Sequence, residues 1–101
     1  MNNEFASFKQ FYPYYLSEHQ NPTCRRLHFI GSLLTLVLLI DFVINQRWAW
    51  MLVLPLVGYG FAWVGHFFFE HNKPATFRYP VYSFLGDWVM FKDILLGRIK
   101  I

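Results

Sequence analysis

Four histidines stand at the edges of the two most apolar stretches of this sequence. They are His19, His28, His66 and His71, and the chain has no other histidine. Neutral imidazole nitrogens bind iron, zinc, copper and nickel, and affinity alone does not choose among these metals. Cys24 is the single cysteine, so the chain can form neither an internal disulfide nor a cysteine-based zinc site. The residue types therefore predict a metal site built from histidines, with Cys24 as an inert thiol beside it.

The spacing of these residues places two histidines at one depth of a helical hairpin. If the hairpin turns at Arg47, His28 precedes the turn by nineteen residues and His66 follows it by nineteen. Nineteen helical residues extend roughly 28 Å, which is close to the hydrocarbon thickness of a bilayer. We therefore expect both rings near one membrane boundary, with His19 reaching the same depth and His71 just beyond the second helix.

Small residues on both helices predict that these two rings face one another. His28 begins a stripe at steps of three and four residues, and His66 ends one at steps of four; the other members are Gly31, Ser32, Thr35, Gly58 and Ala62. Small residues let helix backbones approach closely in lipid, so the stripes are the expected contact faces. Two nitrogens on one ion, each bonded at about 2.0–2.1 Å, lie no more than about 4 Å apart, which is the separation expected here.

The composition favours a membrane protein over a soluble domain. Of 101 residues, 55% are hydrophobic and 22% aromatic, compared with an apolar share of about 45–50% in ordinary soluble domains. Residues 48–69 carry no formal charge, and residues 27–44 carry only Asp41. Both stretches have the length of a membrane-spanning helix, roughly 17–25 residues. The alternative, a hairpin buried in a soluble helical domain, leaves too little chain to cover two apolar helices.

The cationic residues predict the orientation of the hairpin. Eight Lys and Arg residues lie outside the apolar stretches, and Arg47 alone lies between them. Cationic residues concentrate on the cytoplasmic side, so both termini are expected in the cytoplasm, in a bacterial inner membrane or, in a eukaryote, the endoplasmic reticulum. The net charge of +3 is explained by this topology, and the sequence has no nucleic-acid-binding motif. No cleavable signal peptide is expected, because the first apolar run starts near residue 27 and lacks a small-residue cleavage site.

The predicted fold is one all-α integral membrane domain over residues 1–101. A transmembrane hairpin of helices at about 22–45 and 48–71 is flanked by amphipathic interfacial helices at about 3–19 and 80–97. Asn21 caps the second helix with Pro22 in its first turn. The first helix presents Phe5, Phe8, Tyr12, Tyr15 and His19 on one face; the last presents Phe84, Trp88, Phe91 and Leu95, with Lys92 and Asp93 off that side. This last pattern suits a helix on the cytoplasmic leaflet.

Three further polar residues lie within reach of the predicted metal site. Glu70 follows His66 by four residues, so its carboxylate can bind the metal or orient the imidazole. Arg25 precedes His28 by three residues and can meet a lipid headgroup or a substrate carboxylate. Asp41, near the far end of the first apolar stretch, is expected to mark the membrane boundary rather than join the site.

Two motifs resemble the 2-hydroxy fatty acid dioxygenase family of membrane α-oxidation, which includes a yeast enzyme of phytosphingosine degradation. One is Tyr15-x-x-x-His19-x-Asn21-Pro22 followed by His28; the other is Gly65-His66-x-x-x-Glu70 followed by Pro74-Ala75. The resemblance covers most of residues 8–96 and implies a short form, because longer relatives have additional membrane helices between the motifs. It implies that His19, His28 and His66 are the catalytic iron ligands, supported by Tyr15, Asn21 and Glu70. His71 is left open as a fourth ligand.

The resemblance further implies an Fe(II)-dependent oxidoreductase that converts long-chain 2-hydroxy fatty acids to the fatty acid one carbon shorter. The partners of such an enzyme would be the lipid substrate, dioxygen and the membrane. The resemblance is also compatible with a homo-oligomer. Two alternatives remain open from the residues alone. One is a small haem- or metal-binding membrane protein, and the other is a non-enzymatic membrane scaffold whose small-residue stripes mediate association.

Overall fold

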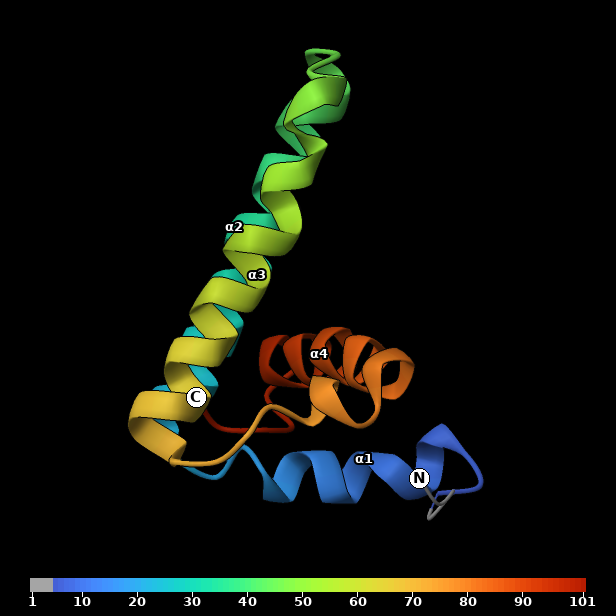
Figure 1. Cartoon of the computed structure of the whole chain (residues 1–101), viewed down its shortest axis with the longest axis vertical. Coiled ribbons are helices and arrows are strands. Elements are labelled where there is room, and N and C mark those ends of the chain that lie inside the picture. The colour runs from blue at the N-terminus through green and yellow to red at the C-terminus, as the bar shows by residue number, and fades with distance from the viewer. Residues whose placement is uncertain (1–4) are drawn as a thin grey trace.

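The computed structural model describes residues 5–101, and helices joined by short loops make up this part of the chain (Figure 1). The elements are α1 (Phe8–Ser17), α2 (Pro22–Ile44), η1 (Trp48–Leu52), α3 (Val53–Val64), η2 (Gly65–Glu70), η3 (Ala75–Phe77) and α4 (Pro80–Leu95). No strand occurs among these described residues. The predicted all-α class is therefore confirmed.

The longest feature is a hairpin in which α2 runs beside the consecutive segments η1, α3 and η2 (Figure 1). Its turn follows α2 at Asn45, and Gln46 adopts a left-handed backbone with φ 54°. Asp41 stabilises the turn, accepting a hydrogen bond from the Asn45 side chain at 2.7 Å and lying 3.8 Å from Arg47 Nε. The hairpin thus turns close to the position expected from the sequence.

The second arm is not the uniform helix expected over residues 48–71. It begins as a 3₁₀ helix, continues as α3 and ends in the wide π turn of η2. His71 then stops the helix in the left-handed region with φ 60°. π turns are rare and often lie at functional sites, and η2 contains His66.

Small residues bring the two arms into close contact, as the stripes predict. A Cβ atom added to Gly31 would lie 2.8 Å from Phe61 Cβ and 3.3 Å from the Gly58 carbonyl oxygen. A Cβ added to Gly65 would lie 3.1 Å from the Cα atom of Cys24. The arms pack backbone to backbone at these points, so larger residues would separate them.

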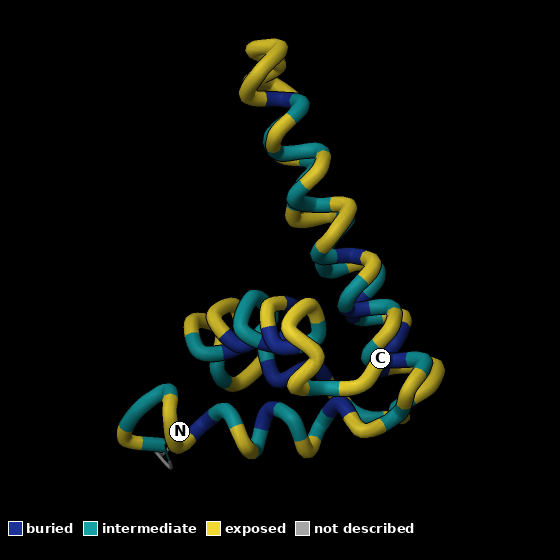
Figure 2. The backbone as a smooth tube through the Cα atoms, turned by 180° about the vertical axis from the view of Figure 1, so that it is seen from behind, coloured by how far each residue is buried: buried dark blue, intermediate teal, exposed yellow. Residues whose placement is uncertain are grey.

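Both arms are long and apolar enough to cross a membrane. The stretches Pro22–Ile44 and Trp48–Glu70 have 23 residues each, with mean hydropathies of 2.3 and 1.6. Exposed and intermediate residues occupy most of the hairpin, and buried residues gather where it meets α1 and α4 (Figure 2). The arms therefore pack on each other along one narrow face and leave the rest uncovered.

At the base of the hairpin, α1 and α4 enclose a small aromatic core. Its buried residues are Phe11, Tyr15, Ala75 and Met90. The expected inward face of α1 included Tyr15 but omitted Phe11, which is 0% exposed. Phe11 precedes Tyr15 by four residues and belongs to the same helical face. The face is therefore centred on these two rings, and Phe5 packs edge-on against Phe11.

The helix α4 has one buried face and one exposed face. Gly86 allows the Tyr15 ring to approach so closely that an added Cβ would lie 2.9 Å from its edge. Of the predicted apolar face, Phe84 and Leu95 are exposed, but Phe91 is buried and stacks on Phe29, because this part of α4 packs against α2. Asp93 is buried and accepts a hydrogen bond from the Tyr12 hydroxyl at 2.8 Å. This partly buried hydrogen bond fixes α4 against α1.

Candidate metal centre

Three histidine rings from three different segments meet where the hairpin joins the base. His19 lies in the link between α1 and α2, His28 in α2 and His66 in η2. The Nε2 atoms of His19 and His28 are 3.0 Å apart, those of His28 and His66 3.1 Å, and those of His66 and His19 2.9 Å. All three side chains are buried. The separation expected for His28 and His66, within about 4 Å, is therefore confirmed.

Asn21 and Glu70 position the segment that carries His19. The Asn21 carboxamide oxygen accepts hydrogen bonds from two amides at the start of α2, at 2.9 and 3.1 Å, as an N-cap does. Its backbone N–H donates to Glu70 Oε1 at 2.8 Å, and its side-chain amide donates to the Phe69 carbonyl at 3.1 Å. Glu70 thus holds the His19 segment against η2, and the His66 ring has a different partner.

The second nitrogen of His19 and of His66 faces a hydrogen-bond acceptor. His19 Nδ1 lies 2.7 Å from the Tyr15 carbonyl oxygen, and His66 Nδ1 lies 2.6 Å from Asn72 Oδ1. The Asn72 amide group donates to the Glu18 carbonyl at 3.2 Å, which turns its oxygen toward His66. Both Nδ1 atoms must therefore carry the proton, and each Nε2 presents a lone pair.

An acid on α4 lies behind the His28 ring. Asp87 Oδ1 lies 3.6 Å from His28 Nδ1 and accepts a hydrogen bond from the Tyr15 hydroxyl. Burial raises the pKa of Asp87 to about 7, and the hydrogen bond from Tyr15 acts in the opposite direction. Burial also raises the pKa of Tyr15, with the nearby Asp87 charge as the next cause. The acid thus connects α1, α2 and α4 directly behind the His28 ring.

The three Nε2 atoms form a donor set that fits a metal ion. Three imidazole lone pairs directed at one point repel one another unless a cation lies between them. Two nitrogens bonded to one ion at about 2.1 Å and at right angles lie about 3 Å apart, close to the separations observed here. Burial lowers the pKa of His19 to about 3, so the ring is neutral at physiological pH, as a metal ligand requires. This donor set suits iron, zinc, copper or nickel.

Three other residues near the site lie outside the donor set. His71 is exposed and lies beyond the π turn, and the group of residues able to hold a metal comprises His19, His28 and His66. Arg25 donates to the carbonyl oxygens of Lys100 at 2.8 Å and His19 at 2.9 Å. Cys24 is buried against Gly65. Arg25 therefore ties the His19 segment to the C-terminal residues.

Sequence reasoning missed two residues that contact the rings, Asp87 and Asn72. Asp87 is the single charged residue in a largely apolar segment at residues 80–91, a pattern that marks an acid with a specific partner. Asn72 had no comparable signal, because it follows His66 by six residues and no helical period pairs these positions. The π turn brings them together, with the Asn72 N–H donating to the His66 carbonyl at 3.1 Å.

Comparison with known proteins places the chain in a family. The family model described as 2-hydroxy-palmitic acid dioxygenase Mpo1-like matches residues 5–99. No curated protein and no solved structure matches the chain. The match covers nearly the whole sequence, including all three histidines of the cluster and the two residues behind them, Asn72 and Asp87. The chain therefore belongs to the 2-hydroxy-palmitic acid dioxygenase Mpo1-like family.

Proposed function

We propose that this protein is an Fe(II)-dependent membrane dioxygenase that converts long-chain 2-hydroxy fatty acids to the fatty acid one carbon shorter. The observation that carries the proposal is the convergence of three buried Nε2 atoms, from His19, His28 and His66, within 3.1 Å of one another. The family description supplies the reaction class and the substrate class. The donor set alone leaves the metal open, and dioxygenase chemistry selects iron from that group.

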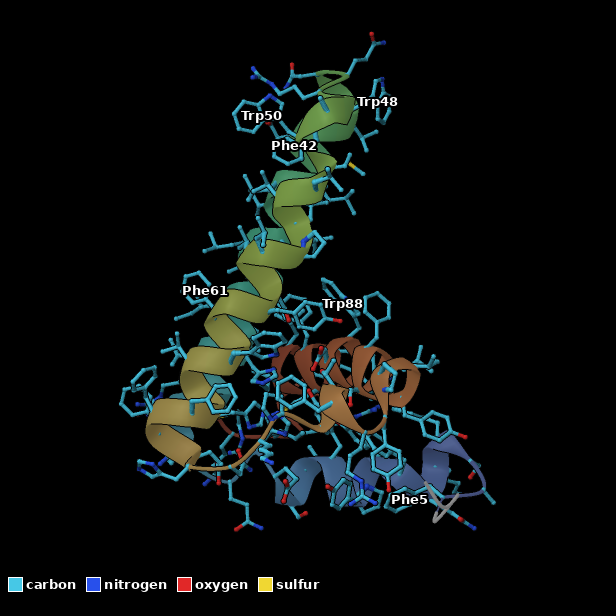
Figure 3. The ribbon with its side chains drawn as sticks, in the orientation of Figure 1. Phe5, Phe42, Trp48, Trp50, Phe61 and Trp88 are labelled. Atoms are coloured by element: carbon cyan, nitrogen blue, oxygen red, sulfur yellow. The ribbon has the colours of Figure 1, made fainter. Side chains whose placement is uncertain are left out.

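Two observations support a location in the membrane. A helical hairpin that formed the core of a soluble protein would be mostly buried. In the most apolar 18-residue stretch of each arm, however, only 17% is buried. Trp48 and Trp50 lie exposed at the tip of the hairpin, where aromatic residues favour the membrane interface (Figure 3). With eight cationic residues at the opposite end, the proposed orientation puts both termini in the cytoplasm and α1 and α4 on the cytoplasmic surface.

This location fits the chemistry of a lipid acid. A long-chain acid in the leaflet keeps its carboxyl group at the membrane boundary and its chain in the hydrocarbon, and the histidines lie at the base of the hairpin where that boundary would be. Conversion to the shorter acid, carbon dioxide and water removes four electrons, which one dioxygen molecule accepts. The reaction therefore needs no external reductant. Ferrous iron, when bound, supplies open coordination positions and the redox chemistry that joins dioxygen to the substrate.

The residues of the chain prepare the site for this chemistry. The Tyr15 carbonyl and Asn72 accept hydrogen bonds from the Nδ1 atoms of His19 and His66, which fixes these two rings and keeps their lone pairs on Nε2. Asp87 lies 3.6 Å from Nδ1 of His28, on the side of that ring away from the cluster. Burial of the three rings excludes bulk water, which strengthens electrostatic interactions within the site. Three protein ligands leave coordination positions for the hydroxyl and carboxylate oxygens of the substrate.

The separations of the histidines weigh against a haem protein. Two axial ligands of one haem lie on opposite faces of the ring and are therefore about 4 Å apart, with the macrocycle between them. Here, three nitrogens lie 2.9–3.1 Å apart around one point, which leaves no space for a macrocycle. In a scaffold without a cofactor, the three nitrogens would converge with no cation to offset the repulsion between their lone pairs.

Oxygen uptake by the purified protein tests the proposal. The protein is purified anaerobically in detergent, loaded with one ferrous ion per chain and given 2-hydroxy acids of several chain lengths. We expect dioxygen consumed, carbon dioxide released and shortened acid formed in equal amounts without added reductant. The 3-hydroxy acid and the unsubstituted acid of the same length are the controls. Failure to consume dioxygen, or equal consumption with the controls, would overturn the proposal, and a Soret band would favour the haem alternative.

A further inference from the structure

An apolar groove leads away from the histidine cluster along the hairpin. It has a volume of about 360 Å³ and lies between the two arms and α4. His28 and Asp87 border one end, and Leu39 and Leu54 border the other. Trp88 lines it from α4, and Figure 3 shows this side chain rising beside the hairpin. The volume falls in the range of small-molecule sites, about 300–1,000 Å³.

The length of the groove corresponds to a long acyl chain. Leu39 follows His28 by eleven residues on α2, which corresponds to about 16 Å along the helix axis. An extended chain advances about 1.2 Å per bond, because a fully extended residue of three backbone bonds spans at most 3.3–3.6 Å. The groove therefore matches about 13 bonds of an extended hydrocarbon chain.

Two hydrogen-bond donors that lack a partner within residues 5–101 line a small cavity next to the metal-site end of the groove. A small cavity of about 10 Å³ adjoins the three rings and shares His28 and Asp87 with the groove. Ser83 and Trp63 line this cavity, and the buried Oγ and Nε1 atoms of these residues have no partner among the described residues. Ser83 is only 1% exposed. Buried polar atoms are almost always paired, so these two donors are available to an acceptor oxygen of a ligand or an ordered water.

We infer that the groove holds the acyl chain of the substrate, with the carboxyl end beside Ser83 and Trp63 and the methyl end between Leu39 and Leu54. This inference rests on the proposed function and extends it, because the length of the groove then determines which chain lengths react well. Acids whose chains fill the groove make more packing contacts with its walls than shorter acids do. Acids that extend past Leu39 and Leu54 gain nothing further inside the protein.

Substitution at the far end of the groove tests this inference by chain-length preference. Leu39→Trp shortens the groove, so the terminal carbons of a sixteen-carbon acid no longer fit and kcat/KM for that acid falls about tenfold relative to a twelve-carbon acid. Ile40→Trp is the matched control, since Ile40 is 50% exposed and lies outside the groove. The ratio of two substrates in one preparation is independent of iron loading. If both variants kept the wild-type ratio, the inference would be wrong.

A crosslinking readout separates this inference from the proposed reaction. A 2-hydroxy acid with a diazirine on its terminal carbon is bound to the protein in detergent, irradiated and mapped by mass spectrometry, which requires no turnover. We expect crosslinks at Leu39 and Leu54 that disappear in Leu39→Trp and persist in Ile40→Trp. Such crosslinks in a protein that does not react with dioxygen would support the groove and reject the proposed reaction. Crosslinks scattered over the exposed side chains of the hairpin would overturn the inference, because the acid would then bind the surface of the hairpin without selecting the groove.

Discussion

Removal of the Asn72 side chain should weaken metal binding without removing a ligand. Asn72 Oδ1 lies 2.6 Å from His66 Nδ1 and holds the proton on that nitrogen. In Asn72→Ala the proton can move to Nε2, which removes the lone pair that binds the metal. Loss of a hydrogen bond behind a ligand typically costs 10–100-fold in metal affinity. Asn72 is half-buried, so water reaches the vacated position. We therefore expect a loss of metal affinity at the lower end of this range, about tenfold or about 1.4 kcal/mol.

The assay is an anaerobic titration of the detergent-solubilised protein with ferrous iron in competition with a chelator of known affinity. Asn72→Asp supplies the control, because a carboxylate oxygen still accepts from Nδ1 and affinity should remain at least as high as in the wild type. Asn45→Ala removes an asparagine at the far turn and should leave affinity unchanged. Wild-type affinity in Asn72→Ala, or an equal loss in Asn72→Asp, would refute the argument that this acceptor orients His66.

Three further predictions concern packing, pH and topology. Gly31→Ala should destabilise the hairpin by about 1–3 kcal/mol in a denaturant titration, because its Cβ would meet Phe61 at 2.8 Å. Gly60→Ala, with open space around the new Cβ, should be neutral or stabilising by up to about 1 kcal/mol. The pKa of Tyr12 is raised above its usual value near 10, by burial and then by Asp93. The contribution of the Tyr12 hydroxyl to stability is therefore fully present below pH 10 and declines above it. Tyr12→Phe should be less stable than the wild type at pH 8 and should lose less stability than the wild type between pH 8 and pH 11. An equal loss of stability in the two proteins would contradict this prediction. Cysteines placed at either chain end should react only with membrane-permeant reagents, and one in the turn after α2 with impermeant reagents; labelling of the ends from outside would reverse the topology.

The position of the metal site could be predicted because it depends on helix length and one turn. Counting residues from Arg47 places His28 and His66 level, and their Nε2 atoms lie 3.1 Å apart. The second arm departs from α geometry at both ends, but neither departure moves His66 far. Its π turn starts at Gly65 and lies almost wholly beyond His66, and its five-residue 3₁₀ segment adds only about 2.5 Å of rise. The two rings therefore stay level to within about half a helical turn.

The surroundings of the rings could not be predicted, because they depend on tertiary packing and on the π turn. The four-residue spacing of His66 and Glu70 indicates one face in an α-helix, but the π turn is wider, and Glu70 accepts from Asn21 instead. Asp87 reaches His28 only because α4 folds back across the base. Hydrophobic periodicity predicts that a helix is amphipathic, but it does not determine the partner of each face.

The number of iron ions per chain in single histidine variants tests the central claim most directly. The wild-type protein, purified anaerobically and loaded with ferrous iron, should retain one ion per chain. His19→Ala, His28→Ala and His66→Ala should each retain almost none, because each removes one of three ligands from a shared site. His71→Ala should retain the wild-type amount, since this exposed residue lies outside the cluster. Iron retained in all three ligand variants, or lost as completely in His71→Ala, would contradict the three-histidine centre.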